Sequence, residues 1–141
     1  MKQEDKKLLL QDLCARLPYK TKIHLTEYSD LTGEKLPSKI KILDYCMLGR
    51  VQAYCKGFRK DEIKPYLFPL SSMTEEQKEE IEEKLIFPSN SNGGWIEILY
   101  NDKYKIPFWF IDFCNKNHFD YRGLIEKGLA IDCTNLNIYE S

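Results

Sequence analysis

The residues that could carry out acid–base chemistry are concentrated in one short segment, residues 118–123. His118, Asp120 and Arg122 stand at alternate positions there, with Tyr121 between the last two. The histidine could act as a general base, the carboxylate could orient it, and the guanidinium could bind an anion. A helix end followed by a turn is the favoured structural interpretation, because a histidine suits the negative end of a helix dipole.

Other reactive side chains give weaker signals. Ser71 and Ser72 precede an expected helix, where they could bind an anion, although helix capping is the commoner role of such serines. Tyr66, in the apolar segment before them, is a further candidate for contact with a ligand or partner. Cys114 and His118 stand four residues apart, which permits a thiol–imidazole pair, but nothing nearby supplies an oxyanion hole. Five widely spaced cysteines without a Cys-x-x-Cys motif predict reduced thiols, and we expect no metal and no cofactor.

Basic residues are concentrated in the first half of the chain. Residues 1–64 carry 14 Lys and Arg against 9 Asp and Glu, a net charge of +5, whereas residues 65–141 carry 7 against 13, a net of −6. The total of −1 argues against a globally basic nucleic-acid binder but permits one basic face. The residues predicted to form that face are Lys20, Lys22, Lys39, Lys41, Lys56, Arg59 and Lys60. Such a face could bind phosphates, or it could be a lysine-rich sheet edge that resists aggregation.

The elements that would position these residues are those of an α+β protein. Leucines spaced three or four apart predict an N-terminal helix over residues 4–17, which Pro18 ends. Alternating apolar residues predict strands over 19–28, 39–47 and 50–56. The first half therefore predicts a small antiparallel sheet or a partly open barrel.

The second half is predicted to be more helical. A helix over 75–86 begins at a capping box, formed by Thr74 with Gln77 or by Ser72 with Glu75. Another helix covers 107–117, although the aromatic residues of 107–113 leave a strand as an alternative. A connection is expected over 57–73, with a helical turn near 61–64 and breaks at Pro65 and Pro69. Strands are expected over 95–100 and 103–105. A turn of helix over 121–127 should be closed by Gly128, and an extended tail should follow over 130–139.

Length and composition bound the protein class. A chain of 141 residues, of which 43% are hydrophobic, predicts a single domain over 1–141. Within it we expect a basic, β-rich part over about 1–64 and an acidic, more helical part over about 65–141. No apolar run approaches the about 20 residues that a membrane-spanning helix needs, and the N-terminus lacks the apolar core of a signal peptide. We therefore expect a cytoplasmic protein without a membrane partner.

Three segments resemble parts of known proteins. These are residues 64–74 (KPYLFPLSSMT), residues 115–125 (NKNHFDYRGLI) with 128–130, and the shorter 13–19 (LCARLPY). They resemble a group of small proteins, without an established activity, that are encoded by gut bacteria of the Bacteroides type and by their phages or mobile elements. The resemblance covers about a third of the chain. It implies a bacterial or phage origin and an accessory role, and it implies no catalytic residue.

The sequence as a whole predicts a non-enzymatic binding protein whose partner is another protein. Nucleic acid bound by the basic face is one alternative, and self-association through residues 65–70 and 108–113 is another. A small enzyme, or a binder of small anionic, nucleotide-like ligands, is the alternative that uses the segment 118–123 together with Tyr66 and Ser71.

Overall fold

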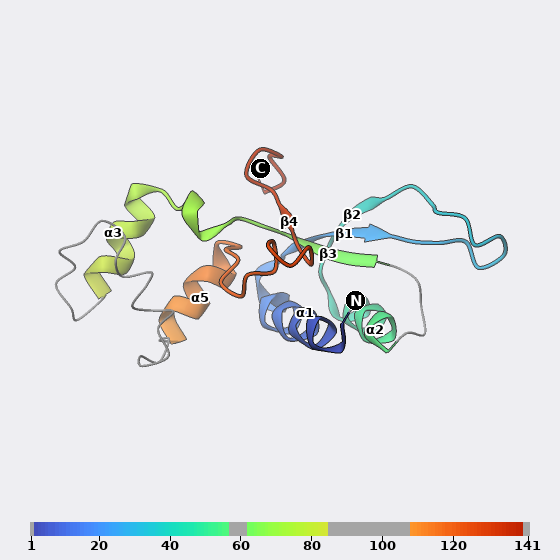
Figure 1. The fold of residues 1–141 in the computed structure, drawn as a ribbon. Helices are drawn as coiled ribbons and strands as arrows, with labels where there is room; N and C mark the ends of the chain where they lie inside the picture. Colours follow the sequence, from blue (N-terminus) through green and yellow to red (C-terminus); the bar gives the residue numbers. More distant parts are fainter. Residues whose placement is uncertain (1, 57–61, 85–107, 140–141) are drawn as a thin grey trace.

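The computed structural model describes residues 2–56, 62–84 and 108–139 (Figure 1). Its elements are α1 (Gln3–Arg16), the 3-10 helix η1 (Leu17–Tyr19), β1 (Lys22–Thr26), β2 (Lys39–Ile42), α2 (Tyr45–Cys55), β3 (Glu62–Leu67), the 3-10 helix η2 (Leu70–Ser72), α3 (Glu75–Lys84), α5 (Phe108–Lys116) and β4 (Ile131–Asp132). The fold is α+β with an N-terminal helix, which confirms the predicted class. The sheet is open rather than closed into a barrel, and it is mixed rather than wholly antiparallel.

The four strands lie in the order β2-β1-β3-β4. β1 is antiparallel to both of its neighbours, whereas β3 and β4 are parallel. β3 crosses residue 64, where the charge of the chain changes sign. It pairs with β1 from the basic half and with β4 from the acidic half.

The helices α1 and α2 cover one face of the sheet. Figure 1 shows them side by side beneath the strands, while the turn between β1 and β2 extends away from the helices. Leu9 and Leu13 of α1 pack with Ile23 and Leu25 of β1 and with Val51 of α2, and all five are fully buried. Burying each such side chain contributes about 1.5–3 kcal/mol, so this cluster fixes the helices to the sheet.

The strand predicted over 50–56 is wrong, because this segment belongs to α2. The carboxylate of Asp44 accepts a hydrogen bond from Met47 N (2.9 Å) and so caps the helix N-terminus. Met47, Val51 and Cys55 are buried at intervals of four, as one face of a helix requires. Val51 and Cys55 fit an alternating pattern equally well, so the spacing of these residues alone does not distinguish a helix from a strand.

The irregular connection predicted over 57–73 is also wrong for the residues that form β3. Pro65 is tolerated because successive residues of a strand direct their backbone groups to opposite sides. Leu67, two residues on, accepts a hydrogen bond on the β4 side from Cys133 N (3.0 Å). The backbone nitrogen of Pro65 is directed to the β4 side as well. The pairing with β4 begins only at Tyr66, so the N–H that proline lacks removes no hydrogen bond from the sheet.

Two helices of the second half agree with prediction. Thr74 N donates to Gln77 Oε1 (2.9 Å) and Gln77 N donates to Thr74 Oγ1 (3.2 Å), which is the first of the two predicted capping boxes. Residues 108–116 form a helix, so the strand alternative for this segment is wrong. The predicted strands at 95–100 and 103–105 lie outside the described residues.

The segment 121–127 forms turns rather than the predicted turn of helix. Its predicted closure at Gly128 is nevertheless present. Gly128 has φ +74°, Gly128 N donates to Ile125 O (3.1 Å), and Leu129 N donates to Leu124 O (2.9 Å). This is the Schellman pattern, in which glycine takes the left-handed position. The tail is extended only at β4 and continues as turns. Among the described helices, none is long and apolar enough to cross a membrane.

Candidate functional site

The candidate segment begins at the last turn of α5. Phe119 N donates to Cys114 O (2.8 Å) and His118 N to Asn115 O (3.3 Å), so His118 holds the position after the helix that usually belongs to glycine. Its φ is +62°, a left-handed conformation that costs a residue with a Cβ about 1–2 kcal/mol. Surrounding contacts must therefore hold His118 in this conformation.

The imidazole of His118 is held by a residue from the C-terminal segment. It stacks on the ring of Tyr139 with centroids 3.8 Å apart, and its Nδ1 lies 3.4 Å from Thr21 Oγ1. Burial lowers the pKa of His118 to about 4, and the positive charges of Arg16 and Lys22 act in the same direction. The ring is therefore neutral at neutral pH.

Asp120 does not orient His118, because its carboxylate is used within its own loop. One oxygen accepts a hydrogen bond from Leu124 N (2.8 Å) and the other from Ile125 N (2.9 Å). Asp120 is buried, and these bonds satisfy amides that the turn would otherwise leave without partners. The carboxylate therefore closes the loop and does not form a catalytic pair with the histidine.

A buried ionic cluster that the sequence analysis missed lies behind the segment. Arg16 is fully buried, and its Nε donates to Asp12 Oδ2 (2.7 Å) while its Nη2 donates to Phe119 O (2.6 Å). Arg122 Nε lies 3.3 Å from Asp12 Oδ1, an ion pair without hydrogen-bond geometry. Both guanidinium groups lie 5.1 Å from the centre of the Tyr121 ring. The spacing of Asp12 and Arg16, four apart between buried leucines, was the available signal.

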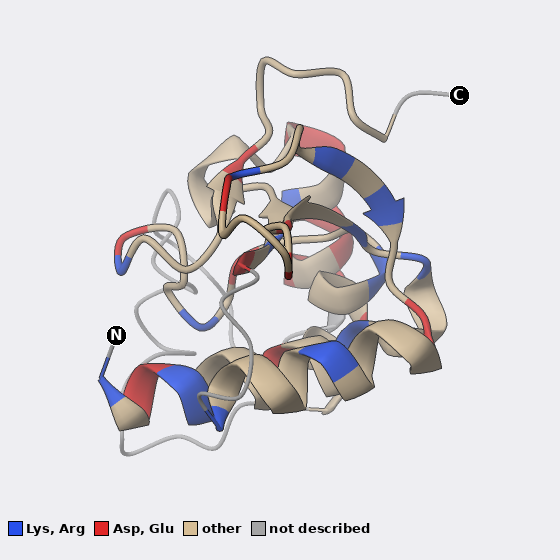
Figure 2. Cartoon of the chain, turned by 90° about the vertical axis from the view of Figure 1, so that its right-hand side faces the viewer, with Lys and Arg blue, Asp and Glu red and all other residues tan. Residues whose placement is uncertain are grey.

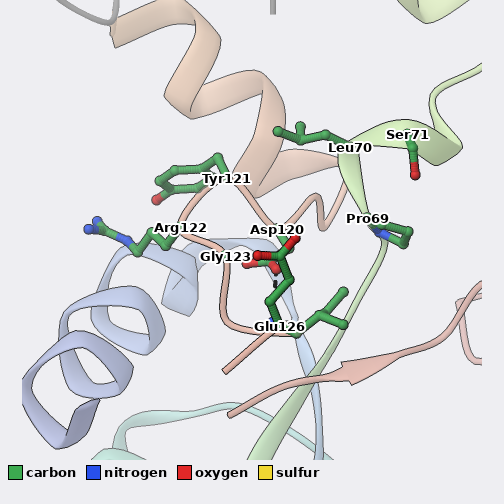
Figure 3. Close-up of a pocket in the computed structure, with 9 residues that line it drawn as sticks. Pro69, Leu70, Ser71, Asp120, Tyr121, Arg122, Gly123 and Glu126 are labelled. Atoms are coloured by element: carbon green, nitrogen blue, oxygen red, sulfur yellow. Dashed lines mark hydrogen bonds between the residues drawn. The ribbon is translucent and has the colours of Figure 1, made fainter. Parts of the chain in front are cut away.

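Four of the predicted site residues line one open pocket of about 450 Å³. Ser71 comes from η2, and Asp120, Tyr121 and Arg122 come from the loop after α5 (Figure 3). Figure 3 shows the guanidinium of Arg122 directed away from Ser71 and toward α1. The rest of the lining is Pro69, Leu70, Gly123, Ile125 and Glu126. Of the two carboxylates in this lining, that of Asp120 is already bonded to Leu124 N and Ile125 N.

The other two predicted site residues lie elsewhere. His118 lines a second pocket of about 430 Å³ together with Lys116, Ser72 and Tyr139. The Tyr66 hydroxyl lies 2.8 Å from His24 Nδ1 on the sheet. The six residues predicted to bind a ligand or partner are thus divided among three places.

The predicted basic residues are also divided. The register places Lys39 opposite Leu25 and Lys41 opposite Ile23, on the face that carries α1 and α2. Lys22 points to the other face, where its Nζ donates to Ile138 O (2.6 Å). Lys20 follows η1 in a left-handed conformation and Lys56 follows α2, while Arg59 and Lys60 lie outside the described residues. Figure 2 shows the Lys and Arg of the described residues distributed over several elements.

The edge strand β2 is the most open part of the sheet. All four of its residues are exposed, and within the described ranges it pairs only with β1. Leu43 N donates to Thr21 O (2.8 Å), which directs the backbone groups of Lys39, Lys41 and Leu43 toward β1. The N–H and C=O groups of Ile40 and Ile42 therefore point outward.

The side chains of these two isoleucines are also accessible. Ile40 is 54% and Ile42 is 51% exposed, on the face opposite α1 and α2. The surface predicted from the sequence includes the neighbouring lysines but not the isoleucines. Their alternation with Lys39 and Lys41 was the signal that could have identified them.

Comparison of the chain with protein-family models, with curated proteins and with solved structures finds no significant match.

Proposed function

We propose that this protein is a non-enzymatic binding protein that holds an extended segment of a partner protein along β2. The observation that carries this proposal is the outward-facing backbone of Ile40 and Ile42 at an edge strand whose residues are all exposed. A partner segment could add itself as a further strand, because main-chain hydrogen bonds supply affinity and alternate side chains supply selectivity. An accessory role in a bacterial or phage cytoplasm, implied by the sequence resemblance, is part of the same proposal.

The surroundings of β2 support an interaction surface. Leu31 at the tip of the β1–β2 connection is 97% exposed, and Leu36 and Tyr45 on either side of β2 are also exposed. With Ile40 and Ile42 they are exposed large apolar side chains on or near β2. A partner segment could cover some of them, and exposed apolar patches often mark interaction sites.

The small-enzyme alternative has less support. It requires a base and an orienting carboxylate, but His118 stacks on Tyr139 and the Asp120 carboxylate is bonded to Leu124 N and Ile125 N. Arg122 is paired with Asp12 rather than directed toward Ser71. These side chains are used to hold the loop after α5 in place.

The test uses the full chain as bait in a lysate of a gut bacterium of the Bacteroides type. Ile40→Pro removes one outward N–H and leaves the ladder with β1 intact, since proline is tolerated where the N–H faces solvent. Ile40→Thr is the matched control, because it shortens the side chain and keeps the N–H. Circular dichroism and thermal unfolding verify that both variants fold.

We expect a protein that is retained by the wild type and by Ile40→Thr but lost with Ile40→Pro. Hydrogen exchange on the purified complex should then show protection of the amides of Ile40 and Ile42. Capture of no protein, or capture that Ile40→Pro leaves unchanged, would show that β2 is not the binding element.

A further inference from the structure

We infer that the segment held by β2 alternates acidic and apolar residues. Its acidic side chains would lie beside Lys39 and Lys41, and its apolar side chains beside Ile40 and Ile42. This inference rests on the proposed function and names the chemistry of the partner.

The two sides of β2 present different side chains to an added strand. Residues directly opposite each other on neighbouring strands share a face of the sheet, with Cβ atoms about 4.5–5.5 Å apart. An added strand therefore meets lysines on one face and isoleucines on the other. Pairs of opposite charge and pairs of apolar residues each contribute about 0.2–1 kcal/mol, and like charges directly opposite are destabilising.

The lysine charges are available to a partner. Neither Lys39 nor Lys41 forms an ion pair with any residue that the structure describes. Both are exposed on the edge strand, beyond the cover of α1 and α2. A carboxylate on the added strand could therefore pair with either lysine.

A second copy of this chain is a poor occupant of the edge. Two copies of β2 paired antiparallel about a two-fold axis place Lys41 opposite Lys41 when Ile40 pairs with Ile42, and Lys39 opposite Lys41 when Ile40 pairs with Ile40. The lysines would then repel each other across the new pair. Lysines on an edge strand are a common device against this self-pairing.

A nucleic acid fits the edge less well than a protein strand. The outward groups of Ile40 and Ile42 comprise both donors and acceptors, and a phosphate backbone offers acceptors but no donors for the two carbonyls. Lys22 lies on the opposite face from Lys39 and Lys41, so the positive charge is not collected along one track. A polypeptide strand supplies both kinds of backbone group.

The test measures fluorescence anisotropy with short labelled peptides. The probe alternates Glu and Val, one control replaces each Glu by Lys, and a second control keeps the composition but groups the glutamates together. The protein is the full chain, as wild type, as Ile40→Pro, and as the double variant Lys39→Glu/Lys41→Glu. Sedimentation of the wild type alone, and anisotropy with a labelled single-stranded DNA, test the other two occupants.

We expect the alternating acidic peptide to bind the wild type about tenfold more tightly than its lysine version, because two favourable pairs replace two repulsive ones. The double variant should reverse this preference, and Ile40→Pro should abolish binding of both peptides.

Equal binding of the acidic and lysine peptides, with both lost in Ile40→Pro, would overturn the inference and leave the edge-strand function standing. The same conclusion follows if no peptide binds while a bait-captured protein still depends on the Ile40 N–H. Peptide binding that Ile40→Pro leaves unchanged would overturn both. A stable dimer in sedimentation, or DNA binding that the double variant abolishes, would assign the edge to another occupant.

Discussion

The imidazole ring of His118 lies parallel to the phenol ring of Tyr139, with centroids 3.8 Å apart and planes 10° apart. The hydroxyl of Tyr139 donates to Tyr66 O (2.8 Å) and accepts from Lys22 N (2.8 Å). Lys22 and Tyr66 would be the next pair of the β1–β3 ladder after Ile23 and Pro65. One side chain of the C-terminal segment therefore bridges two strands where they separate and also holds the end of α5.

Tyr139→Phe should lower the free energy of unfolding by about 1–3 kcal/mol, because it leaves Lys22 N and Tyr66 O without their bridging partner. Tyr139→Ala should cost more, since it also removes the stack on His118. Urea denaturation measures both variants. Tyr45→Phe and Tyr45→Ala are the controls, because Tyr45 is 81% exposed and its replacement should change stability by less than about 0.5 kcal/mol. A Tyr139→Phe protein as stable as the wild type would show that the bridge contributes nothing.

The stability of the protein should depend on the titration of His118. Burial lowers the pKa of this histidine to about 4 in the folded protein, whereas an unfolded histidine has a pKa of about 6.5. Between these values the unfolded chain binds a proton that the folded chain does not bind. The contribution of His118 to stability is therefore complete above about pH 6.5 and is lost as the pH falls toward 4, by at most about 1.4 kcal/mol per pH unit.

The measurement is urea denaturation of the wild type and of His118→Asn from pH 4 to pH 7. Asparagine tolerates the left-handed conformation at this position and does not titrate. Burial raises the pKa of Asp12, which gives stability an opposite dependence on pH, so the difference between the two proteins is the relevant quantity. This difference should shrink as the pH falls. Parallel curves for the wild type and His118→Asn would contradict the assignment.

Local signals in the sequence were enough to predict several elements. The spacing of leucines placed α1, and the Thr74–Gln77 pair placed the start of α3, because both signals act within a few residues. The segment 50–56 was misassigned because its apolar residues fit either period. The cap that Asp44 provides at Met47 N favours the helix α2, and this cap lies outside the segment 50–56.

The candidate site was less predictable, because it depends on contacts between distant segments. The residue types of 118–123 are sufficient to select this segment as a candidate. The stack of Tyr139 on His118 depends on how the C-terminal segment returns to the end of α5, whereas the bonds from Leu124 N and Ile125 N to Asp120 are local. The face of Lys39 and Lys41 depends on the β1–β2 register, since a shift by one residue would move both lysines to the other face of the sheet.

Removing one member of the buried ion pair should strongly destabilise the protein. Arg16→Met leaves the buried carboxylate of Asp12 with only the partial contact of Arg122, and breaking such a pair costs about 3–5 kcal/mol. The double variant Asp12→Leu/Arg16→Met should lose less than the sum of the two single variants, since no uncompensated charge remains. The control is Arg50→Met in the partly exposed pair with Glu27 (3.1 Å), for which we expect a loss of about 1 kcal/mol or less. Additive losses in urea denaturation would show that Asp12 and Arg16 do not act as a pair.

The effect of replacing Asp120 on stability distinguishes a structural loop from a ligand site. If its carboxylate closes the loop, Asp120→Ala leaves two amides without acceptors and should cost about 2–4 kcal/mol, whereas Asp120→Asn keeps one acceptor oxygen and should cost less. Hydrogen exchange should accelerate at Leu124 N and Ile125 N in the alanine variant, because these are the two amides that the carboxylate accepts from. Asp132→Ala is the matched control, since that carboxylate caps an exposed turn at Thr134 N (3.0 Å) and should cost no more than about 1 kcal/mol. An Asp120→Ala protein with wild-type stability and unchanged exchange at both amides would show that the carboxylate is free to bind a ligand in the pocket beside Ser71.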